Sequence, residues 1–147
     1  MTGLGSDHGG FELKNAIIKY LEEKNFACAD FGSFKNESND YPVFARSVCE
    51  AVLNGTCERG ILICTTGIGI SIAANRFRGI RAALCHDVRT AAAAREHNDA
   101  NVLVLGSSIV SEALAKKIID TFIGTGFSGI DRHIRRNKML DEEIFLV

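Results

Sequence analysis

The chain has 147 residues, of which 46% are hydrophobic and 24% are charged, and its formal net charge is -1. This balance excludes a disordered or collagen-like chain, the charge gives no basic footprint for nucleic acid, and no apolar run approaches the roughly 20 residues of a membrane span. Gly3, Gly5, Asp7 and His8 lie where a signal peptide needs an apolar stretch, so we expect one cytoplasmic domain over residues 1–147.

Strand and helix patterns alternate along the chain. Residues 10–24 place Leu13, Ile17 and Leu21 one turn apart, as in an amphipathic helix, and the apolar run 60–64 is typical of a strand buried on both faces of a parallel sheet. Strands are predicted at 1–5, 26–31, 60–64, 80–85 and 101–105. Helices are predicted at 10–24, 41–53, 70–77, 88–97, 111–122 and 130–143.

The order of these elements predicts the fold. Asp40 is expected to cap the second helix, with Pro42 in its first turn, and Ser111 to cap the fifth. Alternation of this kind predicts a Rossmann-like α/β protein, a three-layer α/β/α sandwich around a five-stranded parallel sheet. The strand at 1–5 is the weak point, because so few residues precede the turn at Asp7 and His8.

The five cysteines lie at positions 28, 49, 57, 64 and 85 and form no C-x-x-C pair, so neither a zinc knuckle nor a thioredoxin-type motif is available. Four of them lie among apolar neighbours and are interpreted as small core residues. Cys64 differs, because it ends a buried strand and opens a loop that contains glycines.

Two loops follow strands of the predicted sheet at the end where ligands bind in open α/β proteins, residues 6–10 and 64–71. In the second loop, Gly67 and Gly69 let backbone N–H groups turn inward, and the following helix directs its positive end to the same spot. This loop is therefore predicted to form an anion hole for a phosphate or a developing oxyanion. The same field would favour Cys64 as a thiolate nucleophile or base.

Familiar glycine-loop motifs do not match this segment. A Walker loop needs a lysine that the loop lacks, and the dinucleotide fingerprint needs Gly or Ala where the chain has Ile72. A cysteine phosphatase loop would have Arg at the position of Ile70. The alternative is that the glycines only make a tight turn and Cys64 is buried.

His97 ends the alanine-rich predicted helix, just before the last strand. It is either a helix C-terminal histidine that interacts with the negative helix end or a functional group. A helix-to-strand connection lies at the amino ends of the strands, which is the end of the sheet opposite the loops of Asp7 and Cys64. If His97 joins their chemistry, it most simply does so from a second subunit, which predicts a two-fold dimer with shared sites.

Arg132, His133, Arg135 and Arg136 cluster near the start of the last predicted helix. The cluster is either a solvated face or a phosphate-binding site, for which Arg132 and Arg136 share one helical face.

The residues singled out above occur in a characteristic order. The motifs are Asp7-His8-Gly9-Gly10, Asp40-Tyr41-Pro42, Cys64-x-Thr66-Gly67-x-Gly69, Ala73-Ala74-Asn75, Gly79-Ile80-Arg81-Ala82, His97-Asn98-Asp99-x-Asn101 and Arg132-His133-x-x-Arg136. Over essentially the whole chain, this set resembles the ribose-5-phosphate isomerases of type B, within the group that also holds galactose-6-phosphate isomerase subunits.

The resemblance implies interconversion of ribose 5-phosphate and ribulose 5-phosphate through an enediolate, in the non-oxidative pentose phosphate pathway, without metal or organic cofactor. It implies that Cys64 is the base, that Thr66 bonds a substrate hydroxyl, and that His97 opens the sugar ring. The residues expected to bind substrate, including the loop amides inferred above, are Asp7, His8, Tyr41, Thr65, Gly67, Ile68, Gly69, Ile70, Ser71, Asn98, Arg132 and Arg136.

The resemblance also implies a homodimer with shared active sites, with the C-terminal helix reaching the partner subunit, and leaves dimer and tetramer both open. Ser108 stands where family members often carry Arg, so one phosphate contact is expected to be either missing or supplied by another residue. Three alternatives remain: an isomerase of a six-carbon sugar phosphate such as allose or galactose 6-phosphate, a thiol phosphotransfer or redox protein, and a non-catalytic sugar-phosphate binding module.

Overall fold

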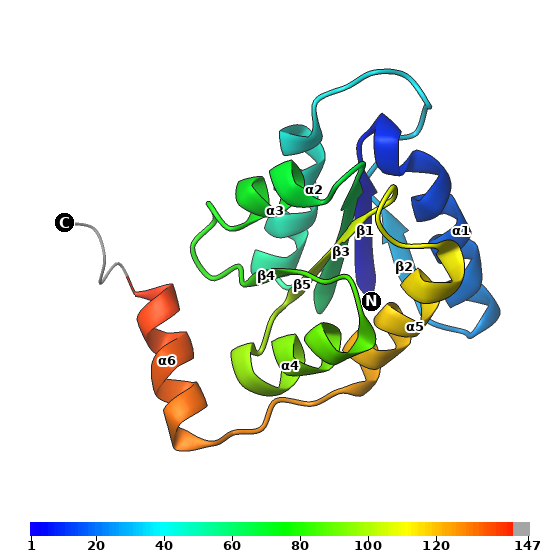
Figure 1. Ribbon diagram of the computed structural model, residues 1–147. Helices are drawn as coiled ribbons and strands as arrows, with labels where there is room; N and C mark the ends of the chain where they lie inside the picture. The colour runs from blue at the N-terminus through cyan, green and yellow to red at the C-terminus, as the bar shows by residue number, and fades with distance from the viewer. Residues whose placement is uncertain (143–147) are drawn as a thin grey trace.

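The structure is a computed structural model, and it describes residues 1–142 (Figure 1). In chain order its elements are β1 (Thr2–Ser6), the 3-10 turn η1 (His8–Gly10), α1 (Phe11–Glu23), β2 (Cys28–Asp30), α2 (Tyr41–Leu53), β3 (Arg59–Cys64), α3 (Ile68–Ala74), β4 (Ala82–Leu84), α4 (Val88–Asn98), β5 (Val102–Gly106), α5 (Glu112–Gly124) and α6 (Asp131–Asp141). The predicted alternation of strands and helices is confirmed.

The five strands form one parallel sheet in the order β2-β1-β3-β5-β4. From β1 the chain first crosses to β2 on one side and then returns to β3 on the other, so the strand order reverses between β1 and β3. The carboxyl ends of these two strands flank the switch point, which is where ligands bind in open α/β sheets. The loops that leave them begin at Asp7 and Thr65.

Alternate residues of the central strands feed two separate cores, as a sheet covered on both faces requires. In β3, Ile61 and Ile63 pack with α1, α4 and α5, whereas Leu62 and Cys64 pack with α2 and α3. Figure 1 shows these two helical layers on opposite faces of the sheet. The predicted three-layer sandwich is therefore confirmed.

The C-terminal helix α6 lies outside the layers, beside α4 (Figure 1). Its buried residues are His133 and Asn137, and the Asn137 side chain donates a hydrogen bond to the carbonyl oxygen of His97 on α4, at 3.1 Å. Within this chain α6 thus covers the end of α4. Among the helices of residues 1–142, none has both the length and the apolar character needed to cross a membrane.

Some elements are shorter than predicted, and at the end of α3 a side chain takes the place of a backbone hydrogen-bond partner. Helix α3 ends at Ala74 and not at 77, since the Asn75 side chain bonds both backbone groups of Ala82, at 2.9 Å each. Strand β4 covers only three residues of the predicted 80–85. Asp40 does precede α2, but its side chain makes no capping hydrogen bond. Strand β1, in contrast, is fully buried along its five residues, and residue 143 of the last predicted helix lies outside the described residues.

Candidate active site

The loop after β1 is held against the end of β3. Asp7 is buried and caps η1, with its Oδ1 accepting the N–H of Gly10 at 3.1 Å. A Cβ atom at Gly10 would lie 2.4 Å from the carbonyl oxygen of Ile63, and one at Gly9 would lie 2.1 Å from Oγ1 of Thr65. Only glycine fits this close approach. The Asp7–Gly10 and Thr65 segments therefore lie against each other at the carboxyl end of the sheet.

The loop after β3 directs backbone N–H groups around Cys64. The N–H of Gly67 donates to Sγ of Cys64 at 3.1 Å, and the N–H of Ile68 donates to Oγ1 of Thr66 at 3.2 Å. Gly67 has φ of +78°, and a Cβ there would lie 2.5 Å from the Leu84 side chain, so this turn requires glycine. Because α3 begins at Ile68, the next N–H groups, which belong to Gly69 and Ile70, have no carbonyl partner within the helix.

Cys64 combines features of both readings of its loop. Its side chain is only 5% exposed and belongs to the core between the sheet and α2–α3, as the burial alternative expects. However, its sulfur accepts a backbone N–H, and the adjacent Thr65 and Thr66 are exposed. A donor directed at sulfur stabilises negative charge there, which suits a thiolate.

Tyr41 reaches the same loop from the first turn of α2. A Cβ at Gly69 would lie 2.5 Å from Cζ of Tyr41, so the ring lies directly against the backbone of α3. The structure thus brings Tyr41 to the Cys64 loop. The expected binding residues Ile70 and Ser71 are differently placed, because the Ile70 side chain is fully buried and Oγ of Ser71 donates to the carbonyl of Ile68 at 2.8 Å. Only the backbone N–H of Ile70 fits the predicted anion hole, since the N–H of Ser71 donates to the carbonyl of Gly67 at 3.1 Å.

Two serines that sequence reasoning did not assign join the loops together. Oγ of Ser107 donates to the carbonyl of Gly9 at 2.6 Å, and Oγ of Ser108 donates to the carbonyl of Thr65 at 2.7 Å. Ser108 is the position at which the resemblance led us to expect Arg. Here its side chain fastens the Cys64 loop to the end of β5. The serine pair after a strand was the signal available in the sequence.

His97 lies at the opposite end of the sheet. It lies in the last turn of α4, which leads into the amino end of β5, whereas Cys64 pairs with Gly106 at the carboxyl end of β5. The His97 ring contacts the His133 ring of α6, with centroids 4.6 Å apart. Arg132 flanks His133 on α6 and is exposed. The chain therefore brings His97 together with the basic cluster, and not with Cys64.

The pKa of His133 is lowered by its surroundings on α6. Burial holds the pKa of His133 below its ordinary value of 6.5, and the charges of Arg132 and Arg136 and the neighbouring His97 act in the same direction. Nδ1 of His133 lies 2.7 Å from Oγ of Ser128, which fixes the ring. His133 therefore presents a largely neutral ring to His97 near pH 7.

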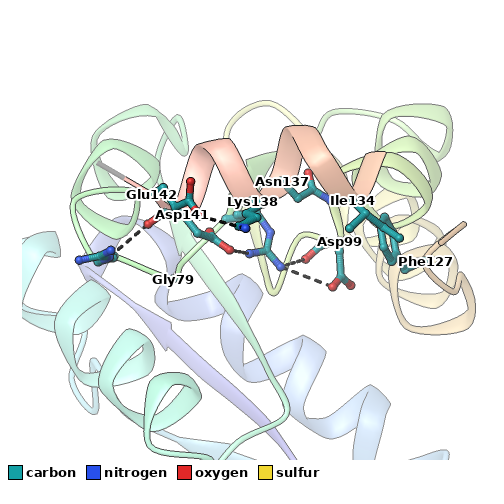
Figure 2. A pocket seen from close by; sticks show the side chains of 10 residues that line it. Gly79, Asp99, Phe127, Ile134, Asn137, Lys138, Asp141 and Glu142 are labelled. Carbon is teal, nitrogen blue, oxygen red and sulfur yellow. Dashed lines mark hydrogen bonds and ion pairs between the residues drawn. The ribbon is translucent and has the colours of Figure 1, made fainter. Parts of the chain in front are cut away.

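Asn98, next to His97, is held by Arg81, the residue before β4. Its carbonyl accepts Nε of Arg81 at 2.8 Å, and the same guanidinium forms an ion pair with Asp141 of α6 at 2.6 Å. Arg81 and Asp141 line a pocket of about 500 Å³ together with Asp99 and Lys138. Figure 2 shows this pocket beneath α6. The pocket adjoins the His97 end of the sheet. Arg81 is occupied in holding α6 and the end of α4 together.

The remaining cysteines and motif residues have structural roles. Cys49, Cys57 and Cys85 are buried as predicted, and burial raises the pKa of Cys49 to about 12, whereas Cys28 is only half-buried. The Asn101 side chain bonds the backbone of residues 79 and 81 and so aligns the start of β4. Within residues 1–142, no group of three or more His, Cys, Asp or Glu side chains is arranged to hold a metal ion.

Comparison with known proteins finds relatives that match most of the chain. The chain is 47% identical over 132 residues to ribose-5-phosphate isomerase B of Escherichia coli K12, covering 90% of this chain and 88% of that protein. It is 40% identical over 127 residues to D-erythrulose-4-phosphate isomerase of Pectobacterium atrosepticum, covering 86% and 84%. The structure of Clostridium thermocellum ribose-5-phosphate isomerase B matches it with a TM-score of 0.94 and 50% identity, covering 97% of this chain and 95% of that one.

The family described as Ribose/Galactose Isomerase matches residues 2–140. This range includes all the elements described above except the last residue of α6. The chain belongs to this family of sugar isomerases.

Proposed function

We propose that this protein is an aldose–ketose isomerase that interconverts ribose 5-phosphate and ribulose 5-phosphate. The observation that carries the proposal is the Cys64 sulfur, which accepts the Gly67 N–H at the switch point of the sheet. Beside it lie the amides of Gly69 and Ile70, which have no carbonyl partner within α3. Relatives named for this reaction share 47% and 46% of their aligned residues with the chain.

In the open-chain sugar, the Cys64 thiolate takes the proton from C2 and the electron pair moves toward the C1 carbonyl oxygen. The resulting enediolate carries negative charge on oxygen, where the amides of Gly69 and Ile70 and the Thr66 hydroxyl act as donors. The proton of the C2 hydroxyl then passes to the C1 oxygen, and the Cys64 thiol returns its proton to C1 as the C2 carbonyl forms, which yields the ketose and restores the thiolate. No redox partner is needed, because the electrons stay within the substrate.

The sugar phosphate arrives as a closed ring, and opening it requires a proton removed from the anomeric hydroxyl and one delivered to the ring oxygen. We assign this exchange to His97, with Asn98 binding a hydroxyl and Arg132 and Arg136 holding the phosphate. Because these groups lie at the other end of the sheet from Cys64, the complete site takes them from a second copy of the chain. A homodimer with two shared sites therefore follows, acting in the cytoplasm within the non-oxidative pentose phosphate pathway.

Turnover of ribose 5-phosphate by the wild-type chain and by Cys64→Ala tests the proposal. Loss of a general base lowers the rate by about 10²–10⁴-fold, so we expect a loss in that range. Cys85→Ala, which removes a buried thiol outside the site, is the matched control and should keep most activity. A wild-type chain without turnover would overturn the proposal and favour a binding module, for which Cys64→Ala leaves ribose 5-phosphate affinity intact.

The substrate and the class of chemistry are tested separately. Allose 6-phosphate, galactose 6-phosphate and erythrulose 4-phosphate are compared with ribose 5-phosphate by kcat/KM, and a clear preference for another sugar would correct the substrate assignment. Intact mass spectrometry during turnover should show no adduct on Cys64. A trapped phosphocysteine or disulfide would instead favour the phosphotransfer or redox alternative.

A further inference from the structure

The His8 imidazole is held by a residue far away in the sequence. Asn39 lies 31 positions later, in the segment between β2 and α2. The backbone N–H of His8 donates to Oδ1 of Asn39 at 3.0 Å, and the backbone N–H of Asn39 donates to Nδ1 of His8 at 3.4 Å. The two residues therefore hold each other through one backbone and one side-chain group on each side.

This pairing selects one form of the His8 ring. A neutral imidazole has one nitrogen that donates and one that accepts, and the hydrogen bond at one nitrogen decides which is which. Since Nδ1 accepts the Asn39 N–H, the ring hydrogen belongs on Nε2. Within residues 1–142, His8 Nε2 has no protein hydrogen-bond partner, so it is available to donate to an oxygen of a ligand.

The Asn39 side chain is itself held by a hydrogen bond to Ser33. Its Nδ2 donates to Oγ of Ser33 at 2.8 Å, and that hydroxyl donates onward to the carbonyl of Lys35 at 2.6 Å. Ser33 is only 3% exposed, and its N–H donates to the carbonyl of Ser6 at 2.6 Å, at the end of β1. Asn39 is thus tied to the strand from which the His8 loop leaves, so the ring has little freedom to turn.

We propose that Asn39 is a positioning residue, which holds the His8 imidazole as an Nε2–H donor toward a phosphate oxygen of the substrate. The proposal rests on the proposed function, in which His8 contributes to the phosphate region of the site. A neutral, oriented donor complements the arginines, because it adds direction without adding another charge.

Steady-state kinetics of Asn39→Ala test the role. The change removes the acceptor of the His8 N–H and the link to Ser33, each a single hydrogen bond, so KM for ribose 5-phosphate should rise about 3- to 10-fold, with kcat changed less than about 2-fold. Asn36→Ala, an exposed amide of the same segment, is the matched control and should leave KM unchanged. A fall in kcat with KM unchanged would contradict the proposal.

A double-mutant cycle separates positioning from a general structural role. If Asn39 acts through the ring, Asn39→Ala should raise KM in the wild-type background but add less than about 2-fold in the His8→Ala background. Ser33→Ala should reproduce part of the Asn39→Ala effect, because it removes the support of Nδ2. An Asn39→Ala effect of equal size in both backgrounds would overturn the proposal.

Nitrogen NMR of the His8 ring gives a readout that does not depend on turnover. The wild-type ring should show an acceptor-type Nδ1 and a protonated Nε2. Asn39→Ala keeps the backbone N–H at position 39 but loses the two side-chain hydrogen bonds that hold this N–H at Nδ1, so the two tautomers should mix. Titration with inorganic phosphate should shift Nε2 of the wild-type chain at about 3- to 10-fold lower concentration than in Asn39→Ala. A protonated Nδ1 in the neutral wild-type ring, or equal phosphate affinities, would overturn the proposal even if the protein isomerises ribose 5-phosphate. The expected NMR result in a protein without turnover would instead fault the proposed function alone.

Discussion

Mixing two inactive variants tests the division of the site between two chains. In one chain, His97 precedes the amino end of β5 and Cys64 pairs with Gly106 at its carboxyl end. The four steps from Val102 to Gly106 alone span about 13 Å at the usual rise of a strand. General acids and bases act within about 3 Å of the atoms they serve, so the two groups of one chain do not reach neighbouring atoms of one sugar.

The magnitude follows from counting sites. Cys64→Ala and His97→Ala chains are each expected to be inactive as homodimers. Equal mixing with full exchange makes about half of the dimers mixed, and each mixed dimer holds one site with both groups intact. Recovered activity should therefore approach about one quarter of that of the same amount of wild-type protein.

The assay is ribulose 5-phosphate formation after subunit exchange, with exchange verified by native mass spectrometry of differently tagged chains. The matched control mixes wild-type chains with a Cys64→Ala/His97→Ala chain. Shared sites predict that exchange lowers the wild-type activity by about half, because a mixed dimer then contains no intact site, whereas unshared sites predict no change. Verified exchange without recovery in the first mixture, and without loss in the second, would refute the shared site.

Three other tests address the packing that supports the site. Asp30→Ala leaves the fully buried Lys14 without its carboxylate at 2.6 Å, so urea denaturation should show a loss of about 3–5 kcal/mol, while Lys14→Met removes the buried charge and should cost less; equal losses would count against this account. Gly10→Ala places a Cβ 2.4 Å from a β3 carbonyl oxygen, so thermal unfolding should show a stability loss of about 1–3 kcal/mol. In the control Gly124→Ala, the new Cβ meets no atom within 4 Å, and the stability should rise by up to about 1 kcal/mol. A Gly10→Ala chain as stable as wild type would show that the loop has room for the methyl group. Burial raises the pKa of Cys49 from its ordinary value of 9.0 to about 12, so the contribution of this thiol to stability is present below pH 9 and falls as the pH rises from 9 toward 12. In urea unfolding measured against pH, Cys49→Ala should therefore show a weaker decline in stability over this range. Identical pH profiles for the variant and the wild type would exclude the effect.

The architecture could be predicted from the sequence because its signals are local. The apolar run that became β3 and the one-turn spacing of Leu13, Ile17 and Leu21 depend on residues a few positions apart, and both elements formed where predicted. Chain order then implied a parallel sheet, and the sheet placed the loops after β1 and β3 together. The glycines of these loops were informative for the same reason, since each serves a close approach or a turn.

Boundaries were less predictable where a side chain far along the chain replaces a backbone partner. Residues 80 and 81 have strand-like composition, yet the Arg81 N–H donates to the Asn101 side chain 20 residues away, and β4 begins only at Ala82. Ser108 shows the same limit, because its bond to the Thr65 carbonyl depends on β5 lying beside β3.

The sequence by itself therefore determined the layers, the edge of the sheet that carries Cys64, and the separation of His97 from it, since these follow from periodicity and chain order. Only the tertiary structure decided that α6 brings its arginines to the His97 end, that Tyr41 lies on Gly69, and that Asn39 holds the His8 ring. The physical reason is range: periodicity records the neighbours of a residue along the chain, whereas these contacts join segments that approach each other only once the sheet has formed.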